Sequence, residues 1–168
     1  AQIETADAPP FAPERLLEGF ARALQQGADA AVCTHVSNVY GNVLPVSAVA
    51  ALCRERGVPL VIDASQSAGT LPVSLRGTGA AFIAMPGHKG LYGPQGTGLL
   101  LCGAAGEPLL QGGTGSNSLD QSMPDFLPDR HEAGTHNVCG IGGLLAGLRF
   151  VCERRPEELL ARECALTA

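Results

Sequence analysis

Residues 82–101 constrain what this chain can fold into more than any other stretch. An apolar run at 82–85 (FIAM) and a second one at 99–101 (LLL) have the length and composition of short buried strands. A glycine- and proline-rich turn that contains Lys89 joins them. Lysine is usually found on solvated faces, since its ammonium group is strongly hydrated. At a strand end of an open α/β sheet, however, Lys89 would face the crevice in which such sheets bind ligands.

A lysine in such a crevice suits one chemistry in particular. Its amine can form an imine with an aldehyde cofactor, pyridoxal phosphate (PLP), which supplies an electron sink. Taken by itself, Lys89 can also be read as an ordinary loop lysine. The other parts of a cofactor site must therefore come from the rest of the chain.

Helical and strand patterns alternate along the sequence. Residues 1–12 are polar and rich in proline, and we interpret them as linker-like. The patterns that follow predict a helix from about Pro13, a buried strand within 28–36, a helix over about 46–56, and a strand at 60–62 that ends at Asp63. This order, with buried aliphatic strands, predicts an α/β fold: a three-layer sandwich with a mostly parallel sheet.

The pattern changes after the second strand of the 82–101 stretch. Residues 112–137 are rich in Gly, Ser, Asn, Asp and Pro and predict a long loop. Loops of this length in a compact domain are usually functional or are ordered by a partner. Helices are then predicted over about 138–152 and from Pro156 onward.

Two polar residues at the end of the 60–62 strand could complete a PLP site. Parallel strands deliver their carboxyl ends to one edge, so Asp63 would lie on the same edge as Lys89. A carboxylate there keeps the pyridine nitrogen of PLP protonated. Gln66 could donate a hydrogen bond to the phenolate oxygen of the cofactor. The alternatives are a turn or helix cap for Asp63 and an exposed turn residue for Gln66.

Charge and hydropathy argue against two kinds of partner. The net charge is −5 and there is no basic stripe, which disfavours nucleic-acid binding. No apolar run approaches the ~18 residues of a membrane span, and no signal peptide is recognisable, so we expect no membrane partner.

The six cysteines are widely and irregularly spaced, without a C-x-x-C pair. This spacing fits neither a zinc site nor a disulfide framework, so we expect free thiols in a reducing cytoplasm. The spacing of His131, His136 and Cys139 matches no standard metal motif, and we expect no metal.

Four ordered segments resemble the class V aminotransferase-fold PLP enzymes, and the cysteine desulfurase group in particular. The segments are T-H-V-S-N-V-Y-G from Thr34, D-A-S-Q-S-A-G from Asp63, G-H-K-G-x-x-G-P-x-G from Gly87, and E-A-G-T-H-N from Glu132. They resemble the family's H-V-S-N-x-x-G, D-A-A-Q-S-A-G, lysine-bearing and E-A-G-T-P-N segments. The resemblance extends from about Pro13 to Val151 and implies an incomplete large domain of the PLP-dependent transferase fold (fold type I).

The resemblance also implies a role for each matching residue. Lys89 would be the catalytic residue that forms the Schiff base with PLP. His88 would help to bind the phosphate, and Thr135 would reach the phosphate of the neighbouring subunit in a homodimer. The implied cofactor-binding set is Asn38, Asp63, Gln66, His88, Lys89 and Thr135.

The implied activity is that of a cysteine desulfurase, which removes sulfur from cysteine to give alanine and an enzyme persulfide. The implied partners are an amino-acid substrate, cysteine or a similar one, a second subunit, and a sulfur-acceptor protein. An aminotransferase, or a selenocysteine or cystine lyase of the same fold, is the alternative. A non-catalytic remnant or interaction module is the alternative from another class. A Walker-type nucleotide site is disfavoured, because the lysine precedes the glycines.

Two departures from the family pattern affect these expectations. Pro86 stands where the family generally has a Ser or Thr that binds the phosphate, so one phosphate contact is missing. Family subunits are also longer at both ends. We therefore expect an incomplete large domain, without the N-terminal segment and the C-terminal small domain of the family, and inactive by itself.

Overall fold

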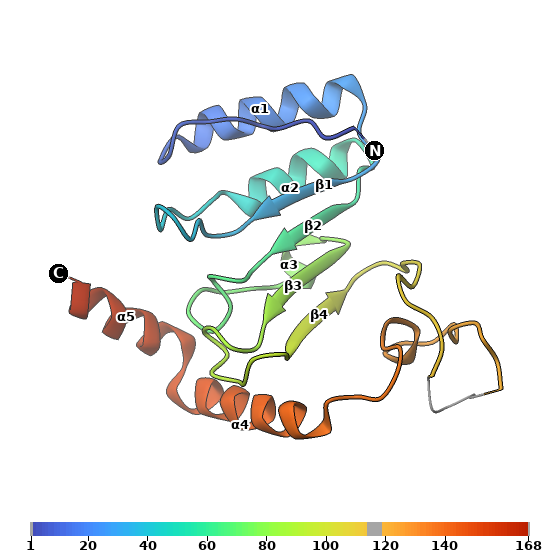
Figure 1. Cartoon of the computed structure of the whole chain (residues 1–168). Helices are drawn as coiled ribbons and strands as arrows, with labels where there is room; N and C mark the ends of the chain where they lie inside the picture. The colour runs from blue at the N-terminus through green and yellow to red at the C-terminus, as the bar shows by residue number, and fades with distance from the viewer. Residues whose placement is uncertain (1, 114–118, 168) are drawn as a thin grey trace.

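A computed structural model describes residues 2–113 and 119–167. It contains one four-stranded sheet with the strand order β1-β2-β3-β4, flanked by helices (Figure 1). The strands are β1 (Ala31–Thr34), β2 (Leu60–Asp63), β3 (Phe82–Pro86) and β4 (Gly98–Cys102). The helices are α1 (Pro13–Gln26), α2 (Val46–Glu55), α3 (Leu75–Thr78), α4 (Val138–Arg154) and α5 (Pro156–Thr167), with a 3-10 turn, η1 (Asp129–His131).

The sheet is mostly parallel. β1 pairs with β2 and β2 with β3 in parallel, whereas β4 returns antiparallel to β3. The predicted α/β fold with a mostly parallel sheet is therefore confirmed. Because β1, β2 and β3 run in the same direction, their carboxyl ends lie at one edge of the sheet.

The core lies between one face of the sheet and α2. Buried residues of α2 recur at the spacing of one helix face, at Val46, Val49, Ala50 and Cys53. They pack with alternate strand residues of the same face, which include Cys33, Ile62 and Ile83 and are at most 4% exposed. Helix α1 packs in turn on α2.

The opposite face of the sheet is more open than the sequence suggested. Val32 in β1 is 68% exposed and Leu100 in β4 is 50% exposed. The prediction of buried strands therefore holds less well for this face among the described residues, because no α-helix there packs on it and η1 reaches it only through His131 against Phe82. Of the three predicted layers, residues 2–113 and 119–167 supply the sheet and the layer formed by α1, α2 and α3.

Some element boundaries also differ from the prediction. The strand expected within 28–36 covers four residues. Helix α3 was not predicted, because a four-residue helix is too short to show a periodic pattern. Its limits are local: the Ser74 hydroxyl accepts a hydrogen bond from Gly77 N at 2.9 Å, and Gly79 ends the helix in the left-handed conformation with φ 66°.

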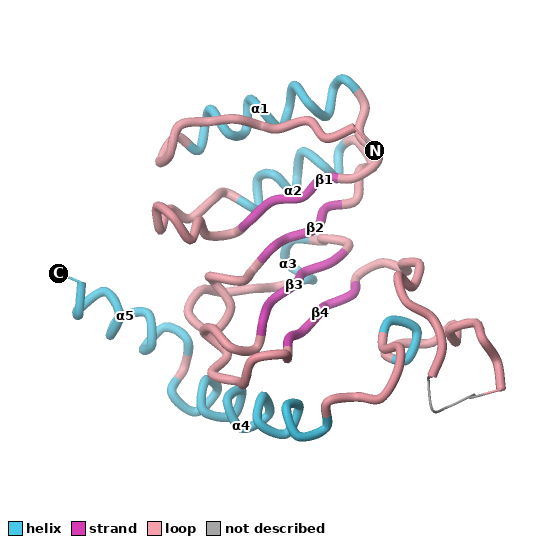
Figure 2. The backbone as a smooth tube through the Cα atoms, viewed as in Figure 1, coloured by secondary structure: helices cyan, strands magenta, loops and turns pink. Residues whose placement is uncertain are grey.

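The segments outside the sheet differ in their packing. Residues 2–12 contain no helix or strand, and they run alongside α1 (Figure 2). A Cβ added to Gly19 of α1 would lie 3.3 Å from Ala6 Cβ, so this segment packs closely on the helix. In the predicted 112–137 loop, η1 is the one helical element of the described part, and residues 114–118 lie outside that part. No helix among the described residues is long and apolar enough to span a membrane.

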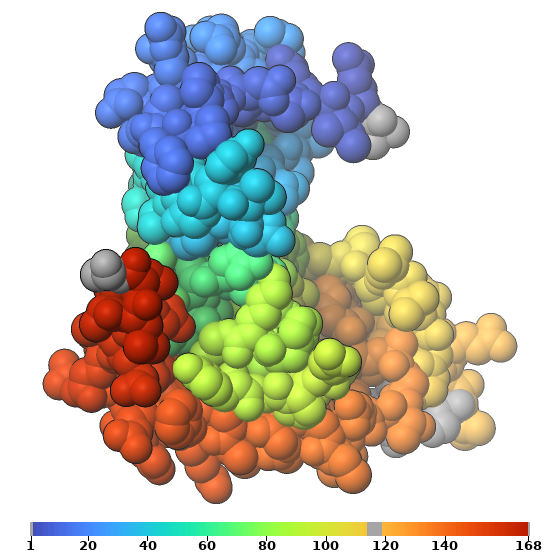
Figure 3. Space-filling model, turned by 60° about the vertical axis from the view of Figure 1, so that its left-hand side comes forward, coloured from blue at the N-terminus to red at the C-terminus, as the bar shows by residue number. Residues whose placement is uncertain are grey.

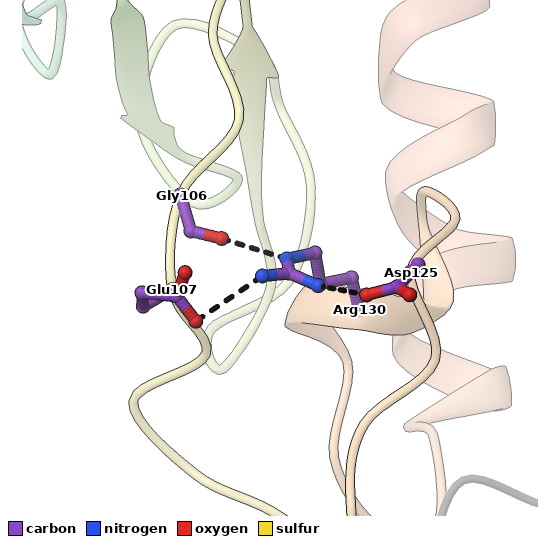
Figure 4. A network of polar contacts seen from close by, with 4 residues as sticks. All are labelled: Gly106, Glu107, Asp125 and Arg130. Carbon is purple, nitrogen blue, oxygen red and sulfur yellow. Dashed lines mark hydrogen bonds and ion pairs between the residues drawn. The ribbon is translucent and has the colours of Figure 1, made fainter.

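Arg130 holds the long segment after β4 together (Figure 4). Its guanidinium donates to Gly106 O at 2.7 Å, to Asp125 Oδ1 at 2.7 Å and to Glu107 Oε2 at 3.1 Å. The Arg130 side chain is 17% exposed, whereas both carboxylates are at the surface. The segment that starts at the end of β4 is thereby tied to the segment that leads into α4.

We expect the two faces of the sheet to respond differently to truncation. Ile62→Ala should lower the free energy of unfolding by roughly 2–5 kcal/mol, because Ile62 is 2% exposed and its loss leaves a cavity. Val32→Ala should lower it by less than about 1 kcal/mol, because that side chain is already largely solvated. Urea denaturation of the two variants measures both values. Equal losses would show that the open face is covered as well.

Candidate functional site

The carboxyl ends of three strands meet at one edge of the sheet. In register, Thr34 of β1 lies beside Asp63 of β2, and Asp63 lies beside Ala84 of β3. The segments that follow these strands contain Asn38, Gln66 and Lys89. In the space-filling view (Figure 3), the turn after β2 (green) is set back between the loop after β1 (cyan) and the turn after β3 (yellow-green). The structure thus assembles a recess from three of the four segments singled out in the sequence.

Asn38 lies in a closed loop between β1 and α2. Leu44 N donates to His35 O at 2.8 Å, so the loop begins and ends beside His35. Within the loop, the Ser37 hydroxyl accepts from Val39 N at 3.3 Å and from Tyr40 N at 3.2 Å. These bonds fix the backbone on both sides of Asn38 and leave its side chain exposed. The Asn38 amide is therefore available to a ligand.

Asp63 is the last residue of β2 and is half-buried. Its Oδ1 accepts a hydrogen bond from Ser65 N at 2.9 Å and another from the Ser65 hydroxyl. These bonds orient the carboxylate, and within the described residues Oδ2 has no hydrogen-bond partner. Gln66, also half-buried, lies one residue after Ser65 in the same turn.

Lys89 lies in the wide turn that joins β3 to β4. Backbone bonds close this turn: Gly87 N donates to Thr97 O at 2.7 Å, and Gly93 N donates to Gly87 O at 2.7 Å. Lys89 and the preceding His88 are exposed. Lys89 is also the only lysine of the chain: of the 11 Lys and Arg residues, all the others are arginines. Our interpretation of the sequence overlooked this signal, although the composition contains it.

The turn after β2 and the Lys89 turn pack backbone against backbone. A Cβ added to Gly69 would overlap Gly90 O, and one added to Gly90 would overlap Ala68 O. Gly69 also has a φ of 93°, a value that favours glycine. Side chains at these two positions would separate the turns, so both glycines are required for the close approach of Asp63 and Gln66 to the lysine segment.

Helix α4 packs against the turn that contains Lys89. A Cβ at Gly143 would lie 3.1 Å from Pro94, and one at Gly147 would overlap Leu91 O. The helix therefore presents its backbone directly to the turn. Tyr92 adopts a positive φ of 54° at this contact and packs edge-on against Phe150 of α4, with ring centroids 5.0 Å apart.

The sixth predicted site residue, Thr135, is not brought to this recess. It lies two residues before Asn137, whose side chain caps the start of α4 by accepting from Gly140 N at 3.0 Å. The turn that contains Lys89 packs along α4 from Gly140, where an added Cβ would lie 2.8 Å from Thr97 Cγ2, to Gly147, where one would overlap Leu91 O. Among the described residues, no hydrogen bond joins Thr135 to this turn.

Two further residues of the site were missed in the sequence, His35 and Ser67. His35 Nδ1 lies 2.9 Å from the Ser67 hydroxyl, which joins the segments after β1 and β2. Burial lowers the pKa of His35, which favours the neutral imidazole. Both residues lie within matching segments of the family resemblance, but no spacing rule predicts a contact between them.

The fold and the lysine-bearing edge of the sheet are typical of the large domain of fold type I enzymes, and comparison with known proteins identifies the family. The family model described as Aminotransferase class-V matches residues 12–168, and this chain belongs to that family. A protein named "Probable cysteine desulfurase" from Methanothermobacter thermautotrophicus is 39% identical over 126 residues, which are 70% of this chain and 31% of that protein. The chain thus spans about a third of the length of this curated relative.

Solved structures agree with this assignment. The apo cysteine desulfurase from Thermococcus onnurineus NA1 superimposes with a TM-score of 0.71 at 32% identity, and the superposition covers 83% of this chain and 36% of that one. The cysteine desulfurase CsdA from Escherichia coli has the same fold, with a TM-score of 0.66 at 24% identity, and its superposition covers 82% of this chain and 37% of that one. The expected resemblance and the fold of a partial large domain are confirmed.

The residues at this edge fit the cofactor of the family. PLP is held by a lysine amine and by a carboxylate at its ring nitrogen. Lys89 and Asp63, from neighbouring strand ends, would supply these two groups, and Asp63 Oδ2, which has no hydrogen-bond partner among the described residues, would accept the N–H of the ring. Pro86, the last residue of β3, lacks a hydroxyl for the phosphate, as the sequence suggested.

The cysteines should differ in reactivity. Burial, with a smaller contribution from Cys53, raises the pKa of the Cys33 thiol to about 12. At a given pH, Cys33 therefore has roughly a thousandfold less thiolate than an unperturbed thiol, whereas Cys139 and Cys152 are exposed. Iodoacetamide at pH 8 should label Cys139 and Cys152 in the folded chain and leave Cys33 unmodified, as measured by peptide mass spectrometry.

The urea-unfolded chain is the control, in which all six cysteines should react. Labelling of Cys33 at the rate of Cys152 in the folded chain would contradict the burial of β1 against α2.

Proposed function

We propose that this chain is the cofactor-binding part of a PLP-dependent cysteine desulfurase. The observation that supports this most directly is the position of Lys89, the only lysine of the chain, in the turn after β3, whose residue Ala84 pairs in register with Asp63 of β2. The similarity to proteins named cysteine desulfurase supports the substrate class, an amino acid such as cysteine. PLP, when bound, supplies the electron sink for breaking bonds at the substrate α-carbon.

Each residue of the recess has a defined task in this proposal. The Lys89 amine would hold the cofactor at its aldehyde carbon and would carry the proton of the substrate α-carbon. The Asp63 carboxylate, oriented by Ser65, would keep the ring nitrogen protonated. Gln66 would donate to the phenolate oxygen, Asn38 would contact the cofactor from the loop after β1, and His88 would bind the phosphate.

Thr135 acts in this proposal through a homodimer. By resemblance to the family, its hydroxyl would reach the phosphate held by a second subunit. Thr135 is exposed, and Val138 and Ile141 at the start of the following helix α4 are 73% and 50% exposed. This exposure supports the arrangement, because a partner would cover these side chains. The whole protein would also pass its sulfur to an acceptor protein.

A cytoplasmic location of the whole protein is part of this proposal, and the six free cysteines support it.

The reaction distinguishes the proposal from its nearest alternative. A desulfurase converts cysteine into alanine with release of sulfur, whereas an aminotransferase of the same fold gives a keto acid. Product analysis of the whole protein with cysteine separates the two.

Lys89 should be the site at which PLP attaches. After incubation with PLP and reduction with borohydride, the chain should gain the mass of one reduced cofactor on the peptide that contains Lys89, and its absorbance should shift from that of free PLP. Lys89→Arg keeps the positive charge but has no amine for the aldehyde, so this label should be lost.

Because Lys89 is the only lysine, the α-amine at the start of the chain is the one competing primary amine, and peptide mapping resolves the two. Equal labelling of the wild-type chain and of Lys89→Arg would contradict the assignment. If the wild-type chain gains no label, the same experiment on the whole protein separates a site that needs further segments, which labels there, from a non-catalytic role, which does not.

A further inference from the structure

We propose that His35 and Ser67 form a positioning pair that locks the three segments of the recess together. The pair does not touch the cofactor in this proposal. It acts through the loop of Asn38 on one side and through the turn of Gln66 on the other. The consequence of the pair for cofactor binding rests on the proposed function, whereas its structural part can be tested without the cofactor.

His35 controls the loop that contains Asn38. Its backbone N–H donates to Asp63 O at 2.8 Å, and its carbonyl accepts from Leu44 N at 2.8 Å. The residue is therefore bonded to the end of β2 and to the far end of its own loop at the same time. Its side chain adds a third attachment, because Nδ1 lies 2.9 Å from the Ser67 hydroxyl.

Ser67 controls the turn that contains Gln66. It is 0% exposed, and the neighbouring Ala64 and Ala68 are 0% and 5% exposed. Its N–H donates to Ala64 O at 3.2 Å, and its carbonyl accepts from Leu71 N at 2.8 Å. A fully buried hydroxyl requires a partner, and His35 supplies the closer one, since Ala64 O lies 3.4 Å away.

The pair also reaches the lysine segment by direct packing. Ala68 and Gly69 follow Ser67 immediately, and their backbone is in contact with Gly90, the residue after Lys89. A shift of Ser67 would therefore move the surface on which the Lys89 turn rests. The sequence of contacts is His35, Ser67, Gly69, Gly90 and Lys89, and it links the segments after β1, β2 and β3.

Backbone amide hydrogen exchange of the 168-residue chain, without cofactor, tests the pair. Ser67→Ala removes the hydroxyl with little change in volume. One hydrogen bond contributes about fivefold to a local opening equilibrium. We therefore expect about fivefold faster exchange of the protected amides of Leu44 and Ala68. His35→Gln should have the same effect, because its polar atoms lie one bond too far from the backbone to replace Nδ1.

Two variants serve as matched controls. His35→Asn places an amide at the same number of bonds from Cα as Nδ1, so it should restore slow exchange. Ser74→Ala removes another hydroxyl hydrogen bond, the cap of α3 to Gly77 N, and should accelerate exchange in α3 alone. The double variant of His35→Gln with Ser67→Ala should exchange no faster than either single variant, because both remove the same bond.

Additive effects in the double variant, or exchange at Leu44 and Ala68 that Ser67→Ala leaves unchanged, would overturn the proposed pairing of His35 with Ser67.

The effect of the pair on cofactor binding is measured separately. Ser67→Ala and His35→Gln should weaken PLP binding, by about the same fivefold factor as the exchange, and His35→Asn and Ser74→Ala should not. Unchanged PLP affinity in Ser67→Ala would overturn the positioning role. A whole protein in which PLP does not attach to Lys89 would instead refute the proposed function, while the exchange result stands.

Discussion

The parallel pairing of β1, β2 and β3 is the constraint on which the site depends. It brings three carboxyl ends to one edge, so Thr34 and Asp63, 29 positions apart, and Asp63 and Ala84, 21 positions apart, become neighbours. Asp63 needs no loop to reach this edge, because it is itself the last residue of β2. Lys89 follows the end of β3 by three residues, at the start of the turn to β4. Asn38 lies in a loop whose far end is hydrogen-bonded to His35. The chemistry is thus set by strand register first and by turn geometry second.

Close backbone contacts then determine how tightly the edge is assembled. Gly69 against Gly90, and Gly143 and Gly147 of α4 against the Lys89 turn, allow main chains to approach where side chains would hold them apart. The abundance of glycine in this chain therefore reflects packing density near the site as much as flexibility. The His35–Ser67 bond adds direction to these contacts, because a hydrogen bond fixes orientation while packing fixes distance.

Much of this arrangement could be predicted from the sequence, for physical reasons. Hydrophobic spacing located α1, α2 and the strands, and four ordered motifs identified the family. The exposure of Val32 could not be predicted, because an apolar strand residue has the same signature whether or not its face is covered. Helix α3 was too short to show a period. The His35–Ser67 contact spans 32 positions and depends on side-chain geometry alone.

The use of arginine for every other basic position has a chemical consequence of its own. A guanidinium does not condense with an aldehyde under the conditions in which a lysine amine does, so the surface of this chain contains no lysine that competes with Lys89. Within this chain, an aldehyde ligand therefore meets a single lysine side chain, with the α-amine as the other primary amine. For the same reason, a reagent selective for lysine side chains reports on Lys89 alone, since this chain has no other lysine.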